Sequence, residues 1–319
     1  MSNPAIPLID MREAHVLPAR LLQAYGEVGF AYVTGHGIPQ ARIEAIFAAS
    51  QKFHALPLEQ KMAVALDQNH RGYIPIATST DRTSTLAEVR RPNQSESFMV
   101  MREAGPDDPQ IVSGAFLAGP NQWPDLPGFR EDVEGYLAAM TALAGRVIQA
   151  FADSLDLDPA ALAAPFQPPT LWLRLLHYPP QPAASPDDLF GSAPHTDWGA
   201  ITLLAQDDVG GLQVMTDEGD WIDVPPRLGT FILNVGDMLH RYSNGVLRST
   251  PHRVINRTGR ERYSCAFFYD PSVEAGVAPF AQLVTAERPA AYEPMNYGDF
   301  LRHQLGSTYD RHGGEPGQN

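Results

Sequence analysis

Cysteine is almost absent from this sequence of 319 residues, which contains only Cys265. An intrachain disulfide is therefore excluded, and this usage fits a reducing compartment. Cys265 lies in the apolar run YSCAFFY, which is typical of a buried strand. A cysteine in such a run is more often a small core residue than a catalytic nucleophile, so we expect Cys265 to be structural.

Long apolar runs and positive charge are also scarce. No segment approaches the roughly 18 apolar residues of a membrane helix, and the first residues, MSNPAIPLID, lack the layout of a secretory signal. There are 23 lysine and arginine residues against 37 acidic ones, a net charge of −14, which argues against a nucleic-acid partner. We expect a cytoplasmic, monomeric protein that acts on a small molecule and binds neither membrane nor nucleic acid.

The order of local signals along the chain predicts a single domain built from four regions. The clearest helix has apolar residues at helical spacing from Phe129 to Leu155. The regions are, in order, a mixed α/β segment (about 1–125), a long bracing helix (about 126–165), a β-rich core (about 170–285), and a C-terminal helix and glycine-rich tail (286–319).

The β-rich region consists of short runs separated by Gly, Asp and Pro. Many short strands divided by turn residues predict a sandwich or barrel, and the double-sheet jelly roll is one such architecture. We therefore expect a mainly β fold with flanking helices. The predicted strands are LWLRLLHY, AITLLAQ, LQVMT, TFILNV, DMLHRYS, RVIN and YSCAFFYD.

The strongest chemical signal is the segment PHTDWG, which is followed 55 residues after Asp197 by His252. Two imidazoles and one carboxylate, from His195, Asp197 and His252, can occupy one face of an octahedral metal and leave three positions open. His195 and Asp197 are expected to share a face, because residues two apart on an extended segment point the same way. His252 must then come from a neighbouring strand.

A second polar group, Arg262-Tyr263-Ser264, begins ten residues beyond His252. In a strand, Arg262 and Ser264 share a face and offer a fork of charged donors beside a hydroxyl, which suits one end of a dicarboxylate. The alternative for Arg262 is a surface ion pair. The apolar residues that follow, CAFFY, instead predict a buried strand.

These motifs resemble those of the 2-oxoglutarate and iron(II)-dependent dioxygenases of the isopenicillin N synthase type. The resemblance covers nearly the whole chain, in the segments GFAYVTGHGIP (29–39), FHALPLEQK (53–61), LRLLHYPP (173–180), HTDWGAITLLAQDDVGGLQV (195–214), NVGDMLHRYSNG (234–245), STPHRVINR (249–257) and RYS (262–264). It implies a double-stranded β-helix, or jelly roll. It also implies iron ligands at His195, Asp197 and His252, and a clamp for the far carboxylate of 2-oxoglutarate at Arg262, Ser264 and Tyr178.

The implied activity consumes O₂ and decarboxylates 2-oxoglutarate to succinate and CO₂ while a small organic substrate is hydroxylated, desaturated or altered in its rings. One departure concerns Leu176, because plant-type members often carry asparagine two residues before the tyrosine that matches Tyr178. A 2-oxoglutarate-independent iron oxidase of the same fold, in which Arg262 and Ser264 hold the substrate's own carboxylate, stays open.

Two other classes and one other ligand pair are weaker alternatives. A non-catalytic ligand-binding jelly roll would usually have a broken ligand set, and a zinc hydrolase would need no Arg-x-Ser clamp. Asp237 and His240 could form a rival metal pair, but Gly236-Asp237 indicates a turn between strands and no third ligand accompanies it.

Strand alternation adds a candidate substrate residue, Arg174. If Tyr178 faces the cavity, then Leu176, Arg174 and Trp172 face it too, and Leu171, Leu173, Leu175 and His177 face the bracing helices. An inward arginine is unfavourable unless something anionic meets it. Arg174 therefore either anchors a carboxylate or phosphate of the primary substrate or forms an internal ion pair with an acid such as Glu96.

Overall fold

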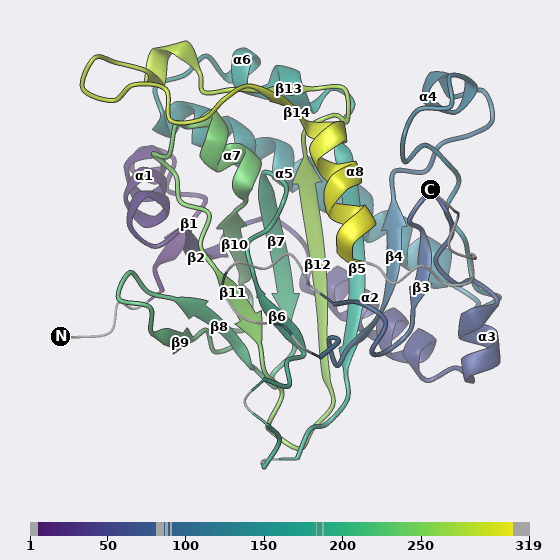
Figure 1. The fold of residues 1–319 in the computed structure, drawn as a ribbon. Helices are drawn as coiled ribbons and strands as arrows, with labels where there is room; N and C mark the ends of the chain where they lie inside the picture. Colours follow the sequence, from purple (N-terminus) through teal and green to yellow (C-terminus); the bar gives the residue numbers. More distant parts are fainter. Residues whose placement is uncertain are drawn as a thin grey trace, which may run out of the picture.

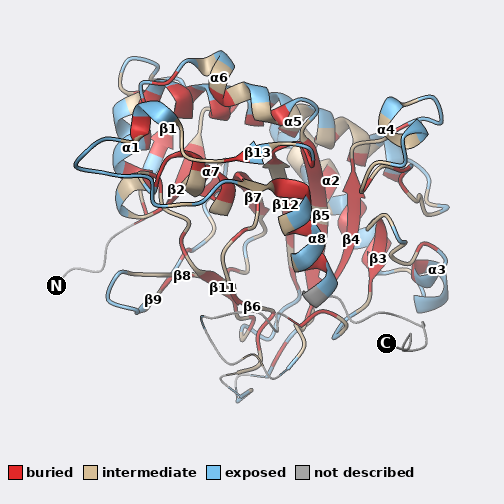
Figure 2. Cartoon of the chain, turned by 45° about the horizontal axis from the view of Figure 1, so that its top comes forward, coloured by how far each residue is buried: buried red, intermediate tan, exposed pale blue. Residues whose placement is uncertain are grey.

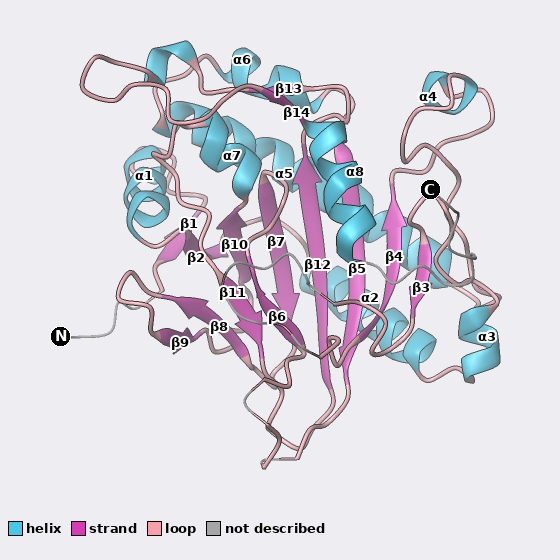
Figure 3. Ribbon diagram, viewed as in Figure 1, coloured by secondary structure: helices cyan, strands magenta, loops and turns pink. Residues whose placement is uncertain are grey.

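The computed structural model describes residues 6–80, 86, 89, 91–182, 184–186 and 188–308. Two β-sheets face each other, and helices cover the outer face of the larger sheet (Figures 1 and 3). This is the double-stranded β-helix that the sequence predicted. The last part of the predicted glycine-rich tail, residues 309–319, lies outside the described residues.

The larger sheet has eight strands in the order β1-β2-β10-β7-β12-β5-β4-β3. Strands from the N-terminal region thus extend both edges of the same sheet that holds the β-rich core. The bounds are β1 Leu8–Asp10, β2 Phe30–Thr34, β3 Gly72–Ile74, β4 Glu96–Met101, β5 Thr170–Tyr178, β7 Ile201–Gln206, β10 Phe231–Val235 and β12 Arg262–Asp270.

The smaller sheet has the order β6-β11-β8-β9 and lies in front of the larger one in Figure 1. Apolar residues from both sheets, among them Leu176, Val214 and Ile232, form a second core between them. A short two-stranded sheet, β13-β14, lies near the C-terminal helix. The bounds are β6 Ser192–His195, β8 Leu212–Met215, β9 Trp221–Asp223, β11 His252–Val254, β13 Gly276–Val277 and β14 Met295–Asn296.

Helices α1 and α2 each pack against α5, and all three pack against the outer face of the large sheet. Their inner faces are buried and their outer faces are exposed (Figure 2). The helices are α1 Leu17–Glu27, α2 Gln40–His54, α3 Leu58–Met62, α4 Pro109–Val112, α5 Phe129–Ser154, α6 Pro159–Ala163, α7 Asp237–Tyr242 and α8 Tyr297–Thr308, with 3₁₀ turns η1 Ala164–Phe166 and η2 Ala281–Leu283.

Helix α5 is the long helix that the apolar spacing predicted. Its residues Val133, Met140 and Phe151 are fully buried in the main core, and each such side chain contributes roughly 1.5–3 kcal/mol by leaving water. The helix ends at Ser154, one residue before the end of the predicted apolar stripe, and the short helix α6 starts at Pro159.

The alternation predicted along β5 is confirmed. Leu171, Leu173 and Leu175 belong to the core beneath the helices. Trp172 and Arg174 line a cavity on the opposite face of the sheet. This division means that one strand supplies both the packing of the helices and one wall of the cavity.

The run DMLHRYS, predicted as a strand, is instead the helix α7. The reason is tertiary: the amides of Asp237 and Met238 donate to the carbonyls of Asp197 and Gly199, both at 2.8 Å. The first amides of a helix have no acceptor within the helix. In a strand, the same amides would instead donate to a neighbouring strand. The first turn of α7 therefore takes the loop after β6 as its partner.

No helix in the described part of the chain combines the length and the apolar character needed to cross a bilayer. Cys265 is fully buried and unpaired in β12, as predicted. Burial raises the pKa of its thiol, which disfavours the reactive thiolate.

Candidate active site

Two histidines and one aspartate converge between the sheets. His195 ends β6 and His252 begins β11, and the two are register partners. Oδ1 of Asp197 lies 3.7 Å from Nε2 of His195 and 3.6 Å from Nε2 of His252. Asp197 lies two residues beyond the end of β6, and its side chain meets that of His195, as the His-x-Asp spacing predicted.

Hydrogen bonds orient each of these side chains toward a common centre. Nδ1 of His195 lies 2.7 Å from the carbonyl of Ala193, and Nδ1 of His252 lies 3.2 Å from that of Thr250. A ring that donates from Nδ1 presents the lone pair of Nε2 as a metal donor. Burial also lowers the pKa of His252 to about 4, which keeps its ring neutral.

The carboxylate of Asp197 is held through its other oxygen. Thr202 Oγ1 and Asn234 Nδ2 donate to Oδ2, at 2.5 and 2.6 Å. Burial raises the pKa of the Asp197 carboxyl, but His252, His195 and these two donors outweigh that effect, so the net shift is downward. Asp197 therefore stays ionised, and Oδ1 faces the two imidazoles.

These three residues fit an iron(II) site. One donor atom from each lies within 4.8 Å of the others, and no second such group occurs among the described residues. Two imidazoles and one carboxylate with open positions are the donor set of non-haem iron(II) oxygenases. The rival pair belongs to no such group: Asp237 accepts from Ser249 at 2.6 Å, and His240 bonds to Tyr292 at 2.6 Å.

The loop that carries Asp197 makes a close approach to β12. A Cβ added to Gly199 would lie 1.6 Å from Oδ1 of Asp270, so only glycine fits there. The amide of Ala200 donates to that same oxygen at 2.9 Å. Sequence reasoning missed Asp270, as it missed Thr202 and Asn234, because each acts from a strand other than the one that carries His195.

Arg262 is fully buried in β12 and lies beside its register partner Tyr178, whose ring centre is 4.6 Å from the guanidinium carbon. Its terminal nitrogens donate to Ser264 at 3.3 Å and to Gln206 at 3.2 Å. Its Nε has no partner, and no carboxylate among the described residues forms an ion pair with Arg262. A buried guanidinium in this state fits a ligand carboxylate.

Gln206 was not predicted from the sequence. It is paired with Ser264 across β7 and β12, so its side chain lies on the same face of the sheet as Arg262 and Ser264. Leu176, where plant-type members carry asparagine, is buried in the apolar core between the sheets. The region near Tyr178 is correspondingly less polar on that side.

The alternative of an ion pair between Arg174 and Glu96 is excluded by the structure. Glu96 lies on the opposite face of the sheet, where it accepts from Lys61 at 2.7 Å, from His177 at 2.8 Å and from Tyr73. Arg174 donates through Nε to Ser97 at 2.9 Å, and no other partner of its side chain occurs among the described residues. Glu96 is paired with His177, which faces the helices, whereas Arg174 is paired with Met99 on the cavity face. The alternation of side chains along the strands therefore places Glu96 and Arg174 on opposite faces of the sheet.

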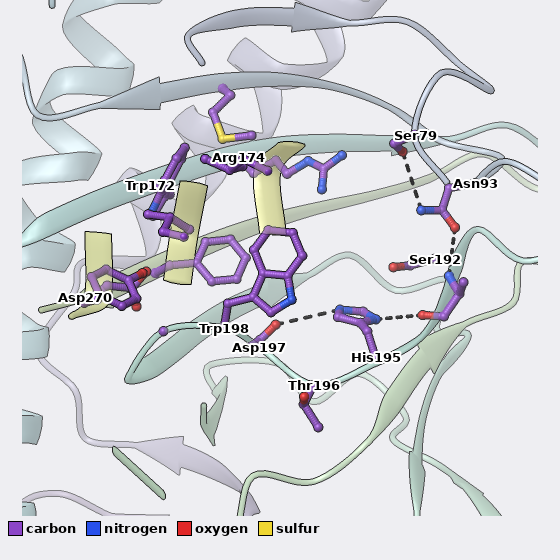
Figure 4. Close-up of a pocket in the computed structure, with 17 residues that line it drawn as sticks. Ser79, Asn93, Trp172, Arg174, Ser192, His195, Thr196, Asp197, Trp198 and Asp270 are labelled. Atoms are coloured by element: carbon purple, nitrogen blue, oxygen red, sulfur yellow. Dashed lines mark hydrogen bonds and ion pairs between the residues drawn. The ribbon is translucent and has the colours of Figure 1, made fainter. Parts of the chain in front are cut away.

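A cavity of about 150 Å³ opens beside His195 and Asp197. Figure 4 shows Trp198 and His195 below strand β5, which carries Trp172 and Arg174. Phe268, Met99, Leu301 and Leu305 add to its apolar lining. The residues of the predicted carboxylate clamp are not part of this lining, so the cavity is a separate space next to the metal ligands.

Comparisons with known proteins agree with this geometry. A family model of the 2OG-Fe(II) oxygenase superfamily matches residues 169–271, and one of the N-terminal region of the non-haem dioxygenases of morphine synthesis matches residues 6–126. A 2-oxoglutarate-Fe(II) type oxidoreductase from Emericella nidulans, hxnY, is 34% identical over 327 residues, covering 98% of this chain and 92% of that protein.

Solved structures give the same result. A full-length Neurospora crassa protein, in complex with 2-oxoglutarate and thymine, has a TM-score of 0.82 at 30% identity, covering 95% of this chain and 96% of that one. JOX2, in complex with 2-oxoglutarate, iron and JA, has a TM-score of 0.79 at 26% identity, covering 97% and 92%. The chain therefore belongs to the 2-oxoglutarate and iron(II)-dependent oxygenase superfamily, and it is a 2-oxoglutarate-dependent dioxygenase with iron(II) and 2-oxoglutarate as its cofactors.

Proposed function

We propose that this dioxygenase binds iron through His195, Asp197 and His252, and that Arg262, with Ser264 and Tyr178, holds the distal carboxylate of 2-oxoglutarate. The observation that carries the proposal is the fully buried guanidinium of Arg262, which has neutral partners but no carboxylate among the described residues. Burial raises the pKa of the Asp207 carboxyl, and Arg262 lies near enough to lower it in part, but no ion pair joins the two, so a ligand carboxylate would be the direct ionic partner of the guanidinium.

The bound iron supplies the activation of O₂ that couples decarboxylation of 2-oxoglutarate to oxidation of the substrate. The chain's own residues set the geometry. The Nδ1 contacts of His195 and His252 fix both rings, and Thr202 and Asn234 fix the Asp197 carboxylate. The apolar core between the sheets limits water near the clamp.

The primary substrate is proposed to be small and anionic, with Arg174 as the residue that binds its negative group. Arg174 lines the cavity beside the metal ligands, and its only partner among the described residues is the hydroxyl of Ser97. The Neurospora crassa protein and JOX2 bind the small molecules named with their structures, which supports a small organic substrate here. Hydroxylation, desaturation and ring chemistry are all compatible outcomes.

We further propose that the chain acts as one oxygenase unit, as a monomer, in the cytoplasm. The sharing of one sheet by β1–β4 and the β-rich core supports the single unit. The single, buried cysteine fits a reducing compartment. Sedimentation velocity and cell fractionation test the last two statements.

Release of CO₂ from 2-oxoglutarate labelled at its first carbon tests the residue assignments. Asp197→Ala should abolish iron-dependent release. Arg262→Ala should weaken 2-oxoglutarate binding by tenfold or more, since removing one partner of a buried charge pair costs about 2–5 kcal/mol. Arg260→Ala is the matched control, because Arg260 is exposed and pairs with Asp208 at 2.9 Å.

Unchanged 2-oxoglutarate affinity in Arg262→Ala would place the clamp elsewhere. Near-normal activity and iron content in Asp197→Ala would refute the metal assignment.

A further inference from the structure

The cavity beside His195 and Asp197 has a size that restricts its occupant. Its volume is about 150 Å³, whereas pockets for drug-sized ligands span roughly 300–1,000 Å³. In another protein, an apolar cavity of about 150 Å³ holds one benzene molecule. The space therefore matches one six-membered ring, with a small substituent extending toward the edge of the cavity.

Three aromatic side chains make up most of one apolar side of the cavity. Trp172, Trp198 and Phe268, which we call the aromatic wall, line it, and the aliphatic Met99, Leu301 and Leu305 add to the apolar lining. Figure 4 shows the indole of Trp198 facing the strand that bears Trp172. Flat rings gain offset-stacked and edge-to-face contacts with such walls, worth about 0.5–1.5 kcal/mol per pair beyond the burial of area. A planar aromatic occupant is thus favoured over an aliphatic one of equal volume.

The charged side chains of the cavity point to an anionic group on that occupant. Arg174 is half-buried, and its terminal nitrogens have no partner among the described residues. The two acids in the lining are engaged: Asp197 faces the imidazoles, and Asp270 accepts from Ala200 and from Tyr297. Among the described lining residues, the guanidinium of Arg174 is therefore the charge available to an occupant, and its planar fork suits a carboxylate.

Strand register sets the spacing between the cation and the aromatic wall. Arg174 lies opposite Ala266, whose methyl group leaves the guanidinium uncovered on that side. Trp172 lies opposite Phe268, two residues further along the same face. Two residues of strand span roughly 7 Å. The negative group must then be attached to the ring directly or through a short linker.

We propose that the primary substrate is a monocyclic aromatic or heteroaromatic carboxylic acid, with its ring against the aromatic wall and its carboxylate on Arg174. The inference rests on the proposed function, because it takes the cavity beside the metal ligands as the site of the oxidised substrate. It goes further by naming the ring, its size and the short link to the carboxylate.

Binding of four probes to the enzyme loaded with iron(II) and 2-oxoglutarate, without oxygen, tests this class. Benzoate is the reference; benzamide lacks the charge, cyclohexanecarboxylate lacks the flat ring, and 2-naphthoate has a second fused ring. Calorimetry gives each Kd, and quenching of tryptophan fluorescence reports entry next to Trp172 and Trp198. We expect benzoate to bind at least tenfold more tightly than each of the other three.

Two variants separate the contribution of the carboxylate from that of the aromatic ring. Arg174→Gln should weaken benzoate binding by tenfold or more and leave benzamide binding unchanged. Phe268→Leu should reduce the preference for benzoate over cyclohexanecarboxylate. Arg130→Gln is the matched control for loss of one positive charge, because Arg130 is exposed on α5 and pairs with Glu134.

Equal binding of benzoate and benzamide, or benzoate binding that survives Arg174→Gln, overturns the carboxylate. Equal or tighter binding of 2-naphthoate or cyclohexanecarboxylate overturns the single aromatic ring. An enzyme that decarboxylates 2-oxoglutarate in an Asp197-dependent way but binds none of the probes refutes the substrate class alone. Loss of that decarboxylation itself refutes the proposed function instead.

Discussion

The hydroxyl of Tyr297 donates a hydrogen bond of 3.0 Å to the carboxylate of Asp270. Both side chains are buried, and both line the cavity. The other oxygen of Asp270 accepts from the amide of Ala200, three residues after Asp197. One carboxylate thus connects helix α8 to the loop that carries a predicted metal ligand.

We expect Tyr297→Phe to lower the free energy of unfolding by about 1–3 kcal/mol, because a buried carboxylate loses a donor. Tyr297 is the first residue of α8, so loss of its hydrogen bond to Asp270 should weaken the attachment of that helix. Amide hydrogen exchange in α8 should therefore become faster. Urea denaturation and hydrogen exchange measure the two effects. The matched control is Tyr25→Phe, which removes a buried hydroxyl bonded to the carbonyl of Leu233 at 3.1 Å. Identical α8 exchange in the two variants contradicts the link.

Thr202→Val should weaken metal binding by about 10–100-fold, because partners that orient a metal-ligating carboxylate have effects of this size. Thr202 donates to Oδ2 of Asp197 at 2.5 Å, and valine keeps the shape without the hydroxyl. Anaerobic titration with iron(II) measures the affinity. Thr230→Val is the control, since Thr230 bonds to the carbonyl of Arg227 at 2.8 Å, away from the site. Equal affinity in both variants would remove Thr202 from the metal site.

Glu96→Gln should lower the free energy of unfolding by about 3–5 kcal/mol, because the ammonium of Lys61 is left buried without its partner. The two side chains are 2.7 Å apart and only 8% and 10% exposed. Adding Lys61→Met should recover part of the loss, so the double variant should be more stable than the sum of the single changes predicts.

Urea denaturation measures both Glu96 variants. Glu134→Gln breaks the exposed pair with Arg130 and should change stability by less than about 1 kcal/mol. A Glu96→Gln variant as stable as this control would show that the buried pair contributes nothing.

The pH dependence of stability should carry the signature of His54. Burial lowers the pKa of its imidazole from 6.5 to about 4. Between these two values the unfolded chain binds a proton that the folded chain does not, so stability falls as the pH falls from 6.5 to about 4. The effect amounts to about 3 kcal/mol at most, and this group adds none above pH 6.5.

Denaturant titrations at several pH values between 7 and 4 test the prediction for His54. The His54→Gln variant should lose less stability over this range than the unchanged protein. His15→Gln, at an exposed position, should follow the unchanged protein. Parallel curves for His54→Gln and the unchanged protein would rule out the effect.

The sequence by itself determined what depends on local periodicity. Alternation along β5 put Arg174 and Trp172 on the cavity face and Leu173 on the helix face, and the apolar spacing of α5 marked its buried stripe. The same alternation placed Arg262 and Ser264 together on one face of β12. These relations hold within one strand or helix, so no partner element is needed to predict them.

Only the tertiary structure decided which strands lie side by side and how the loops between them close. Asp197 reaches the histidines from the loop after β6, which α7 and Asp270 hold in place. Glu96 takes the far face because its register with β5 is out of phase with Arg174. Register between strands distant in sequence follows from the packing of the whole sheet, and a local pattern carries no record of it.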